Sequence, residues 1–226
     1  MERRDQVKQN KPPSHVHTKV VNTISGGSDI CGNTYSAAKR HAKESKGDKP
    51  EALEFKLRRT SDLPTVTFDE SDSDGSDSHH DGLVISLSIG NCLIRRVLID
   101  TGSSTNLLTL DALKEMGLTE NDLIKKSTPL VGFSGEVKHT TGEIILTTYA
   151  GGINQQVKFL VLDCPSPYNC ILGRPWIHAM KAVPSTYHQI IKFPTEWGVQ
   201  EIRGDQRTAK ECYVASMKNA VEHRIA

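Results

Sequence analysis

The chain has few aromatic residues and no long apolar run. Aromatic side chains make up 5% of its 226 residues, and hydrophobic ones 36%. Single-stranded nucleic acids bind largely by stacking on aromatic rings, so this scarcity argues against a nucleic-acid platform on the folded part. The low apolar content predicts that part of the chain stays outside a packed core. The longest apolar stretches are far too short for a membrane span, and the N-terminus lacks the apolar region of a signal peptide. We therefore expect an intracellular, cytoplasmic protein without membrane association.

Cysteines are few and are not arranged for cross-linking or metal binding. There are five, an odd number, with no C-x-x-C pair. We expect Cys92, Cys164, Cys170 and Cys212 to be reduced thiols. The His79-His80-Asp81 triplet is better explained as a polar turn than as a metal site, so we expect neither a metal nor a cofactor.

The net charge is only +1, but charge is distributed unevenly along the chain. Residues 1–60 hold thirteen Lys and Arg against seven Asp and Glu, whereas residues 61–82 hold seven acids and no Lys or Arg. The acidic run 69–78 repels itself and has little to bury. We therefore predict that residues 1–82 form a disordered linker, first basic and then acidic, that 83–204 fold, and that 205–226 form a C-terminal extension. The basic part is interpreted as a solvated linker, with RNA or another protein region as the alternative partner.

From residue 83 the sequence alternates between short apolar segments and turn residues. This spacing is typical of an all-β barrel or sandwich. Two short helices are expected, each after a strand that ends in glycine. The first is at 110–116, capped by Thr109 or Asp111 and ended by Gly117, and the second is at 174–181. Residues 34–45 and 207–225 are further candidate helices. The expected strands are 83–89, 92–99, 129–134, 136–149, 156–163, 170–173 and 186–193.

The most informative motif is Asp100-Thr101-Gly102-Ser103-Ser104, which follows the apolar run Val97-Leu98-Ile99. A strand that ends in such a loop presents one carboxylate beside a glycine, where backbone and substrate can come close. The short hydroxyls can hydrogen-bond a carboxylate or fix the loop. On its own the tripeptide is also consistent with a strand that simply ends in a turn.

The motifs that follow give the loop its context. A glycine-rich segment, Leu130-Val131-Gly132-Phe133-Ser134-Gly135-Glu136, comes first, and Tyr168-Asn169-Cys170-Ile171-Leu172-Gly173-Arg174-Pro175-Trp176 comes later. This order resembles that of the retropepsins, the aspartic proteases of retroviruses and retrotransposons. The chain looks most like the protease segment of gypsy-type long-terminal-repeat retrotransposon polyproteins of plants. The specific similarity covers about residues 83–204.

The resemblance implies a role for each matching position. Asp100 would be catalytic, Thr101 would bridge two active-site loops, Gly102 would accept a hydrogen bond from substrate, and Ser103 occupies the small position beside the glycine. The flap that closes over a bound peptide would be formed by Gly132, Phe133, Ser134 and Gly135. The fold would be a retropepsin-like acid-protease barrel with two short helices.

Peptide hydrolysis by carboxylates requires two of them close together, one ionised and one protonated. This chain has a single D-T-G, so a site of this type requires a homodimer with one Asp100 from each chain. Retropepsins are homodimers, as the resemblance implies. One position departs from the family: Ser104 stands where retroviral enzymes usually have an acid that pairs with the arginine at Arg174. Arg174 then either caps the loop or faces solvent, and association is left to apolar packing and to strands near the end of the chain, such as 186–193.

The sequence therefore predicts an aspartic endopeptidase that cuts polypeptide segments of a retroelement polyprotein. The alternative is a catalytically inert retropepsin-fold binding domain left by a decayed or domesticated element. An RNA-associated module built on the basic N-terminal region is a third hypothesis, disfavoured by the low aromatic content.

Overall fold

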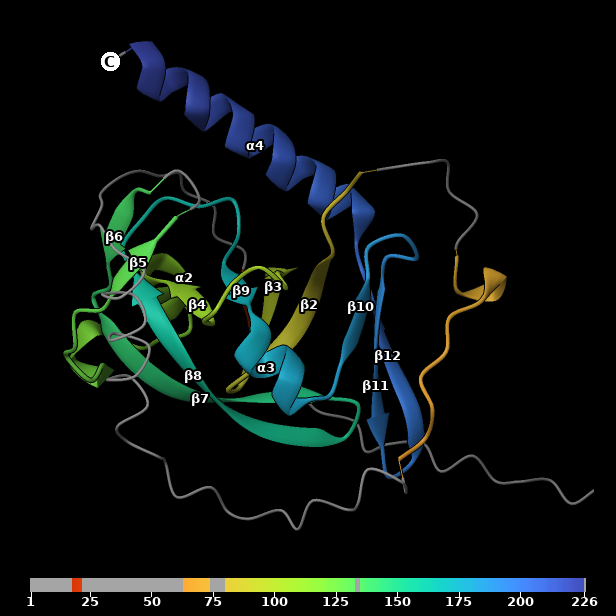
Figure 1. Cartoon of the computed structure of the whole chain (residues 1–226). Coiled ribbons are helices and arrows are strands. Elements are labelled where there is room, and N and C mark those ends of the chain that lie inside the picture. Colours follow the sequence, from red (N-terminus) through yellow and green to blue (C-terminus); the bar gives the residue numbers. More distant parts are fainter. Residues whose placement is uncertain (1–17, 22–62, 74–79, 133–134, 226) are drawn as a thin grey trace, which may run out of the picture.

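The computed structural model describes residues 18–21, 63–73, 80–132 and 135–225. Within them, β-strands dominate (Figure 1). No helix in these stretches is long and apolar enough to cross a membrane. The strands are β1 (Lys19–Val21), β2 (Val84–Ile89), β3 (Cys92–Ile99), β4 (Leu107–Thr109), β5 (Pro129–Val131), β6 (Val137–His139), β7 (Gly142–Ala150), β8 (Ile153–Leu162), β9 (Cys170–Leu172), β10 (Val183–Ser185), β11 (Ile190–Thr195) and β12 (Gly198–Arg203).

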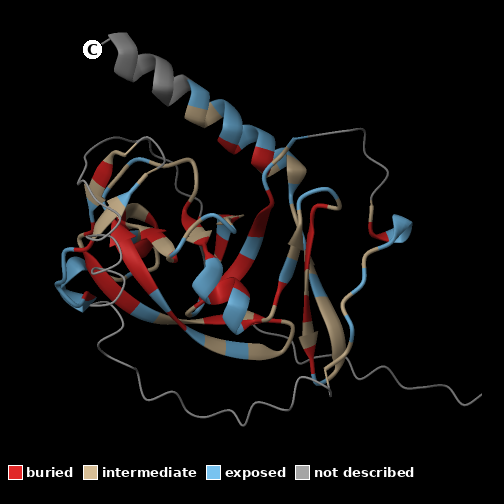
Figure 2. Ribbon diagram, in the orientation of Figure 1, coloured by how far each residue is buried: buried red, intermediate tan, exposed pale blue. Residues whose placement is uncertain are grey.

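Six of these strands close into a barrel in the order β3-β2-β7-β8-β4-β9, with β9 pairing back onto β3. β7 and β8 form its longest hairpin, and β1 extends the sheet by running parallel to the first half of β3. Apolar side chains fill the interior, with Ile94, Leu108 and Phe159 fully buried. Figure 2 shows the buried positions gathered along these strands. The all-β fold class predicted from the sequence is confirmed.

The two short helices expected from the sequence are both present. α2 (Leu110–Glu115) begins at Thr109, whose hydroxyl accepts the N–H of Ala112 at 3.2 Å. Gly117, with φ at +85°, follows its end, because that conformation strains a residue with a side chain. α3 (Arg174–Ala179) lies directly after β9 and buries Trp176, whose indole N–H donates to the buried Thr148 hydroxyl of β7 at 3.0 Å. That bond satisfies both polar groups and docks the helix on the barrel.

The last helix, α4 (Gln206–Ile225), also exists where 207–225 was a candidate. Asp205 caps it by accepting the Thr208 N–H at 3.0 Å and the Thr208 hydroxyl at 2.7 Å. These two bonds lower the pKa of the Asp205 carboxyl. Ala209 and Cys212 are buried at its base, and the helix then runs away from the barrel (Figures 1 and 2).

Two predicted strands are wrong in extent. The strand expected at 136–149 is broken at Thr140, whose N–H donates to the Thr128 carbonyl at 3.1 Å and whose hydroxyl accepts the Thr128 N–H at 2.9 Å. This side-chain bond ends the β5–β6 hairpin, and β7 then joins β2 and β8 instead. β8 also begins earlier than expected, and the short strand β4 was not predicted.

The strand expected at 186–193 is a turn in its first half, between β10 and β11, and only its second half is strand. His188 and the Ser185 hydroxyl share a 2.8 Å hydrogen bond in that turn, and Gln189 has φ at +52°. β11 is consequently the central strand of a three-stranded sheet, flanked by β10 and by β12, which was not predicted. Because both of its edges are paired, it has no free edge to offer a second chain; only β10 and β12 are edge strands of this sheet.

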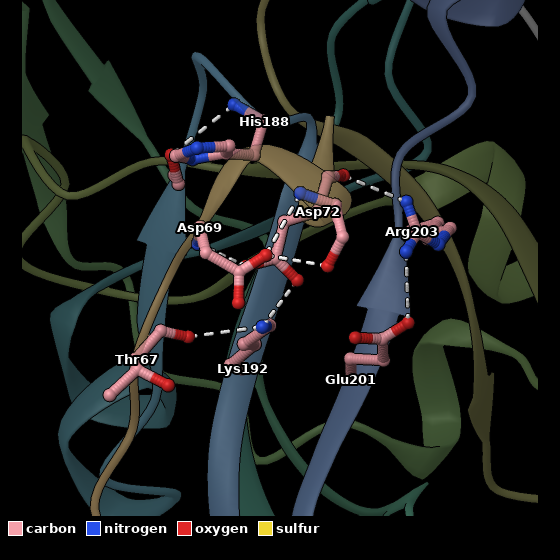
Figure 3. A network of polar contacts seen from close by, with 9 residues as sticks. Thr67, Asp69, Asp72, His188, Lys192, Glu201 and Arg203 are labelled. Atoms are coloured by element: carbon pink, nitrogen blue, oxygen red, sulfur yellow. Dashed lines mark hydrogen bonds and ion pairs between the residues drawn. The ribbon is translucent and has the colours of Figure 1, made fainter. Parts of the chain in front are cut away.

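Part of the region expected to be linker is ordered against this sheet. Residues 63–73, here called the strap, run alongside β12 (Figure 1) and end in the 3₁₀ turn η2 (Glu70–Asp72). Lys192 of β11 forms an ion pair with Asp72 and donates to the Thr67 carbonyl at 3.0 Å (Figure 3). Arg203 of β12 donates to the Asp72 carbonyl at 3.0 Å. The acidic run thus contributes a buried contact to the domain at Asp72.

The rest of residues 1–82, including the candidate helix at 34–45, lies outside the described residues apart from 18–21 and 80–82. The boundary at 83 stays a prediction, although β1 pairs with β3 and the strap bonds to β12, and both of these strands lie beyond residue 83. The four cysteines in the described part are free thiols, and burial raises the pKa of Cys170 far above its usual range.

The ion pair of the strap makes a testable contribution to stability. Lys192 lowers the pKa of Asp72, so its stabilising effect is present above the carboxyl's unfolded pKa of about 3.9 and is lost as the pH falls through the folded value. We expect Asp72→Asn to lower the thermal unfolding temperature at pH 7. The unfolding temperature of the variant should then fall less than that of the parent when the pH is lowered below about 4.

The matched control is Glu211→Gln, which removes an exposed ion pair with Arg207 on α4. Exposed pairs of this kind contribute little, so its unfolding temperature should stay close to that of the parent. Equal unfolding temperatures for Asp72→Asn and Glu211→Gln across the pH range would show that the strap does not stabilise the domain.

Candidate active site

The candidate site is built where β3 leaves the barrel. Ile99 is the last strand residue, paired in parallel with Leu172 of β9, and the chain turns sharply at Asp100. The Asp100 N–H still donates to the Leu172 carbonyl at 3.0 Å, so the backbone of the candidate catalytic residue is held by the sheet. Its side chain is partly exposed. A carboxylate at this place is both fixed and accessible.

The loop fixes the carboxylate through its own backbone. The Gly102 N–H donates to Asp100 Oδ1 at 2.8 Å, and the Ser103 N–H donates to the Asp100 carbonyl at 3.2 Å. A Cβ at Gly102 would lie 3.1 Å from Asp100 Oδ1, which is tighter than ordinary contact. The Ser103 hydroxyl donates to the Thr105 carbonyl at 2.8 Å and so ties down the second half of the loop. Thr101 is exposed.

A second loop packs directly on the first. It is the turn between β9 and α3, and Gly173 is its contact point. A Cβ there would lie 2.3 Å from the Thr105 carbonyl oxygen and 2.8 Å from that of Ser103. No side chain fits between these backbones, so glycine is required for the close approach.

Arg174 caps the D-T-G loop. Its N–H donates to the Ser103 carbonyl at 3.0 Å, and its Nη1 donates to the carbonyls of Thr101 at 3.1 Å and Gly102 at 2.8 Å. The sequence left open whether Arg174 caps the loop or faces solvent; it caps the loop and is itself exposed. Ser104, at the position that is acidic in retroviral enzymes, is exposed. Because Arg174 donates to it, the carbonyl of Gly102, the expected acceptor for substrate, already accepts one hydrogen bond.

Asn106 is a buried polar residue that the sequence did not single out. Its side chain accepts the Gly173 N–H at 3.0 Å and donates to the Lys158 carbonyl of β8 at 3.2 Å, and the residue is only 3% exposed. The one available signal was an asparagine directly before the apolar pair Leu107-Leu108, where a buried polar group needs partners.

Glu143 is a second buried polar residue that was missed. Lys126 and Lys158 approach its two oxygens at 3.3 and 3.2 Å, while Glu143 itself is 5% exposed. The two ammonium groups compensate the buried carboxylate, which lies at the start of β7. This cluster links β7 to β8 and to the segment before β5, and we interpret it as structural.

The predicted flap is a hairpin in a sheet of its own, formed by β5 and β6. The Gly132 N–H donates to the Glu136 carbonyl at 2.7 Å, and Gly135, with φ at +89°, donates to the Gly132 carbonyl at 3.1 Å. Phe133 and Ser134, the predicted tip, lie outside the described residues. Val131 of β5 is 55% exposed, whereas Val137, its partner on β6, is buried.

Comparisons with known proteins find similarity in structure only. No protein-family model matches the sequence, and no curated protein matches it. One similar solved structure is the retroviral protease-like domain of Ddi1 from Leishmania major, with a TM-score of 0.45 and 12% identity over 56% of this chain and 96% of that one.

Two further structures are of the same kind. The EIAV protease in complex with the inhibitor HBY-793 has a TM-score of 0.36 and 23% identity over 49% of this chain and 98% of that one. A retropepsin-like aspartic protease from Rickettsia conorii has a TM-score of 0.38 and 19% identity over 47% of this chain and 86% of that one. These similarities concern the fold.

Proposed function

We propose that this chain is an aspartic endopeptidase that acts as a homodimer, with one Asp100 from each chain in a shared site. The observation that carries the proposal is the state of Asp100: a partly exposed carboxylate at the end of a barrel strand, held through its backbone by Leu172 and through Oδ1 by Gly102. A strand that merely ended in a turn would not need Gly173 and Arg174 to pack so closely on its loop.

The chemistry follows from two such carboxylates facing each other. Two like charges a few ångströms apart cannot both ionise, so the pair retains one proton. The ionised carboxylate takes a proton from water, and the water oxygen bonds to the peptide carbonyl carbon. The protonated carboxyl meanwhile gives its proton to the carbonyl oxygen. The carboxyl that took the water proton then gives it to the amide nitrogen, the C–N bond breaks, and the other carboxylate takes back a hydroxyl proton, which releases an acid and an amine and restores the pair. The reaction requires no metal or cofactor in this scheme.

Substrate binding is assigned to the surfaces around this loop. An extended peptide would lie between the Asp100 loop and the β5–β6 hairpin, held by main-chain hydrogen bonds and apolar side-chain pockets. Closure of the hairpin tip, which includes Gly132, Phe133, Ser134 and Gly135, would exclude water from the site. We further propose, on the resemblance of the ordered motifs, that the natural substrate is a retroelement polyprotein of the plant gypsy type.

The inert-domain alternative is favoured by one observation. Arg174 donates to the carbonyls of Thr101 and Gly102, two exposed residues of the loop. If this arrangement persists with peptide present, the loop has one acceptor position fewer for a substrate.

The experiment that separates the two functions is a cleavage assay with the full chain. An unfolded polypeptide is incubated with the purified protein between about pH 4 and pH 7, and fragments are identified by mass spectrometry. We expect internal cuts next to apolar residues, fastest at mildly acidic pH. Binding of the polypeptide with no fragments at any pH would establish the inert-domain alternative instead.

A further inference from the structure

One of the bonds between the two loops of the candidate site is made by a buried side-chain amide, that of Asn106. Three consecutive residues of the β9–α3 turn hold the D-T-G loop: Leu172 accepts the Asp100 N–H, Arg174 binds three of its carbonyls, and Gly173 reaches Asn106. The bond to Leu172 fixes the loop where it begins. The bond from Gly173 to Asn106 fixes it where it ends.

Asn106 also connects this pair of loops to the barrel. Its Nδ2 donates to the Lys158 carbonyl, and its own carbonyl accepts the Leu160 N–H at 2.9 Å, so the residue is bonded to β8 at two points. The orientation of the amide is set by its partners, because Gly173 offers only a donor and Lys158 only an acceptor. A side chain of this length that both accepts and donates is needed to bridge them.

We propose that Asn106 is a positioning residue, which sets the place of the Asp100 carboxylate by locking the D-T-G loop between Gly173 and β8. This inference rests on the proposed function. Asn106 touches no substrate; it acts through the backbone of the loop. In a homodimer an error in loop position displaces both carboxylates of the shared site, and a displacement of about 1 Å lowers a rate roughly 10²-fold.

Replacing the Asn106 amide by a carboxyl group tests this role, because it predicts a pH-dependent change in activity that a general loss of stability would not produce. In Asn106→Asp the ionised carboxylate still accepts from Gly173 but cannot donate to Lys158. The protonated acid can do both, and it matches the amide in shape. Burial favours protonation, so the lost bond should return at mildly acidic pH. The charged groups on the segments bonded to this side chain are Asp100, Arg174, and Lys158 with its partner Glu143.

The experiment compares kcat and KM of Asn106→Asp with those of the parent chain across the pH range in which the parent cleaves peptide. Near pH 7 we expect kcat of Asn106→Asp to be about 10²-fold below that of the parent, with KM nearly unchanged. The ratio of the two kcat values should recover towards one as the pH falls. Asn106→Leu, which can neither accept nor donate, should remain low at every pH. Thermal unfolding of each variant establishes that the folded protein is being assayed.

Asn169→Asp is the matched control. Asn169 is also buried, 1% exposed, and its Nδ2 donates to the Arg95 carbonyl at 3.0 Å, away from the D-T-G loop. It should lose stability without a pH-dependent change in kcat. A ratio for Asn106→Asp that is flat with pH, or an Asn106→Leu chain that is folded and as active as the parent, would overturn the positioning role. An inactive parent chain would instead refute the proposed function, so the two failures are distinguishable.

Discussion

Asp100→Asn should abolish peptide cleavage while leaving the fold intact. The amide cannot take a proton from water, and the loss of an acid–base group costs roughly 10²–10⁴-fold or more in rate. The fold should survive because Oδ1 still accepts the Gly102 N–H, and because Leu172 holds the backbone of residue 100 rather than its side chain. Circular dichroism and thermal unfolding of the variant should match those of the parent, and the initial rate of peptide cleavage should fall to background.

The matched control is Asp163→Asn, which neutralises an exposed carboxylate just after β8. It changes the net charge by the same amount as Asp100→Asn and should leave the cleavage rate unchanged. A purified Asp100→Asn chain that cuts at the parent rate would place the chemistry elsewhere.

The strands and loops that could be predicted from the sequence are those with a local signal. β2, β3 and the D-T-G loop follow from alternating apolar residues that end at a turn, and α2 follows from Thr109 and Gly117. Each of these signals lies within a few residues of the structure it specifies. The loop motif could be recognised for the same reason, since its chemistry is contained in consecutive residues.

The features that were missed depend on partners far along the chain. Asn106 is buried because Gly173, 67 residues away, requires an acceptor, and nothing beside Asn106 indicates this. Asp72 was assigned to an acidic linker on composition, whereas Lys192, 120 residues away, draws it into a buried ion pair. Composition describes the average environment of a segment and does not identify single residues that have a specific partner.

The break at Thr140 illustrates a third limit. The segment 136–149 has the pattern of one strand, but the bonds between Thr140 and Thr128 divide it into a hairpin strand and a barrel strand. Ser185 and His188 divide 183–195 in a similar way. Local side-chain bonds to the backbone compete with strand pairing, and propensity does not show which of the two forms.

The central claim is that each working site contains one Asp100 from each of two chains, and mixing the parent with Asp100→Asn tests it most directly. The parent is held at a concentration where its specific activity no longer rises, and the inactive chain is added in increasing amounts. If the chains associate at random, parent activity should fall to about one half with one equivalent and to about one tenth with nine, because parent chains enter mixed dimers that lack one carboxylate. Adding the Asp163→Asn chain instead should raise the activity. Parent activity that stays constant under a ninefold excess of the Asp100→Asn chain, when sedimentation shows that the chains associate, would contradict the shared site.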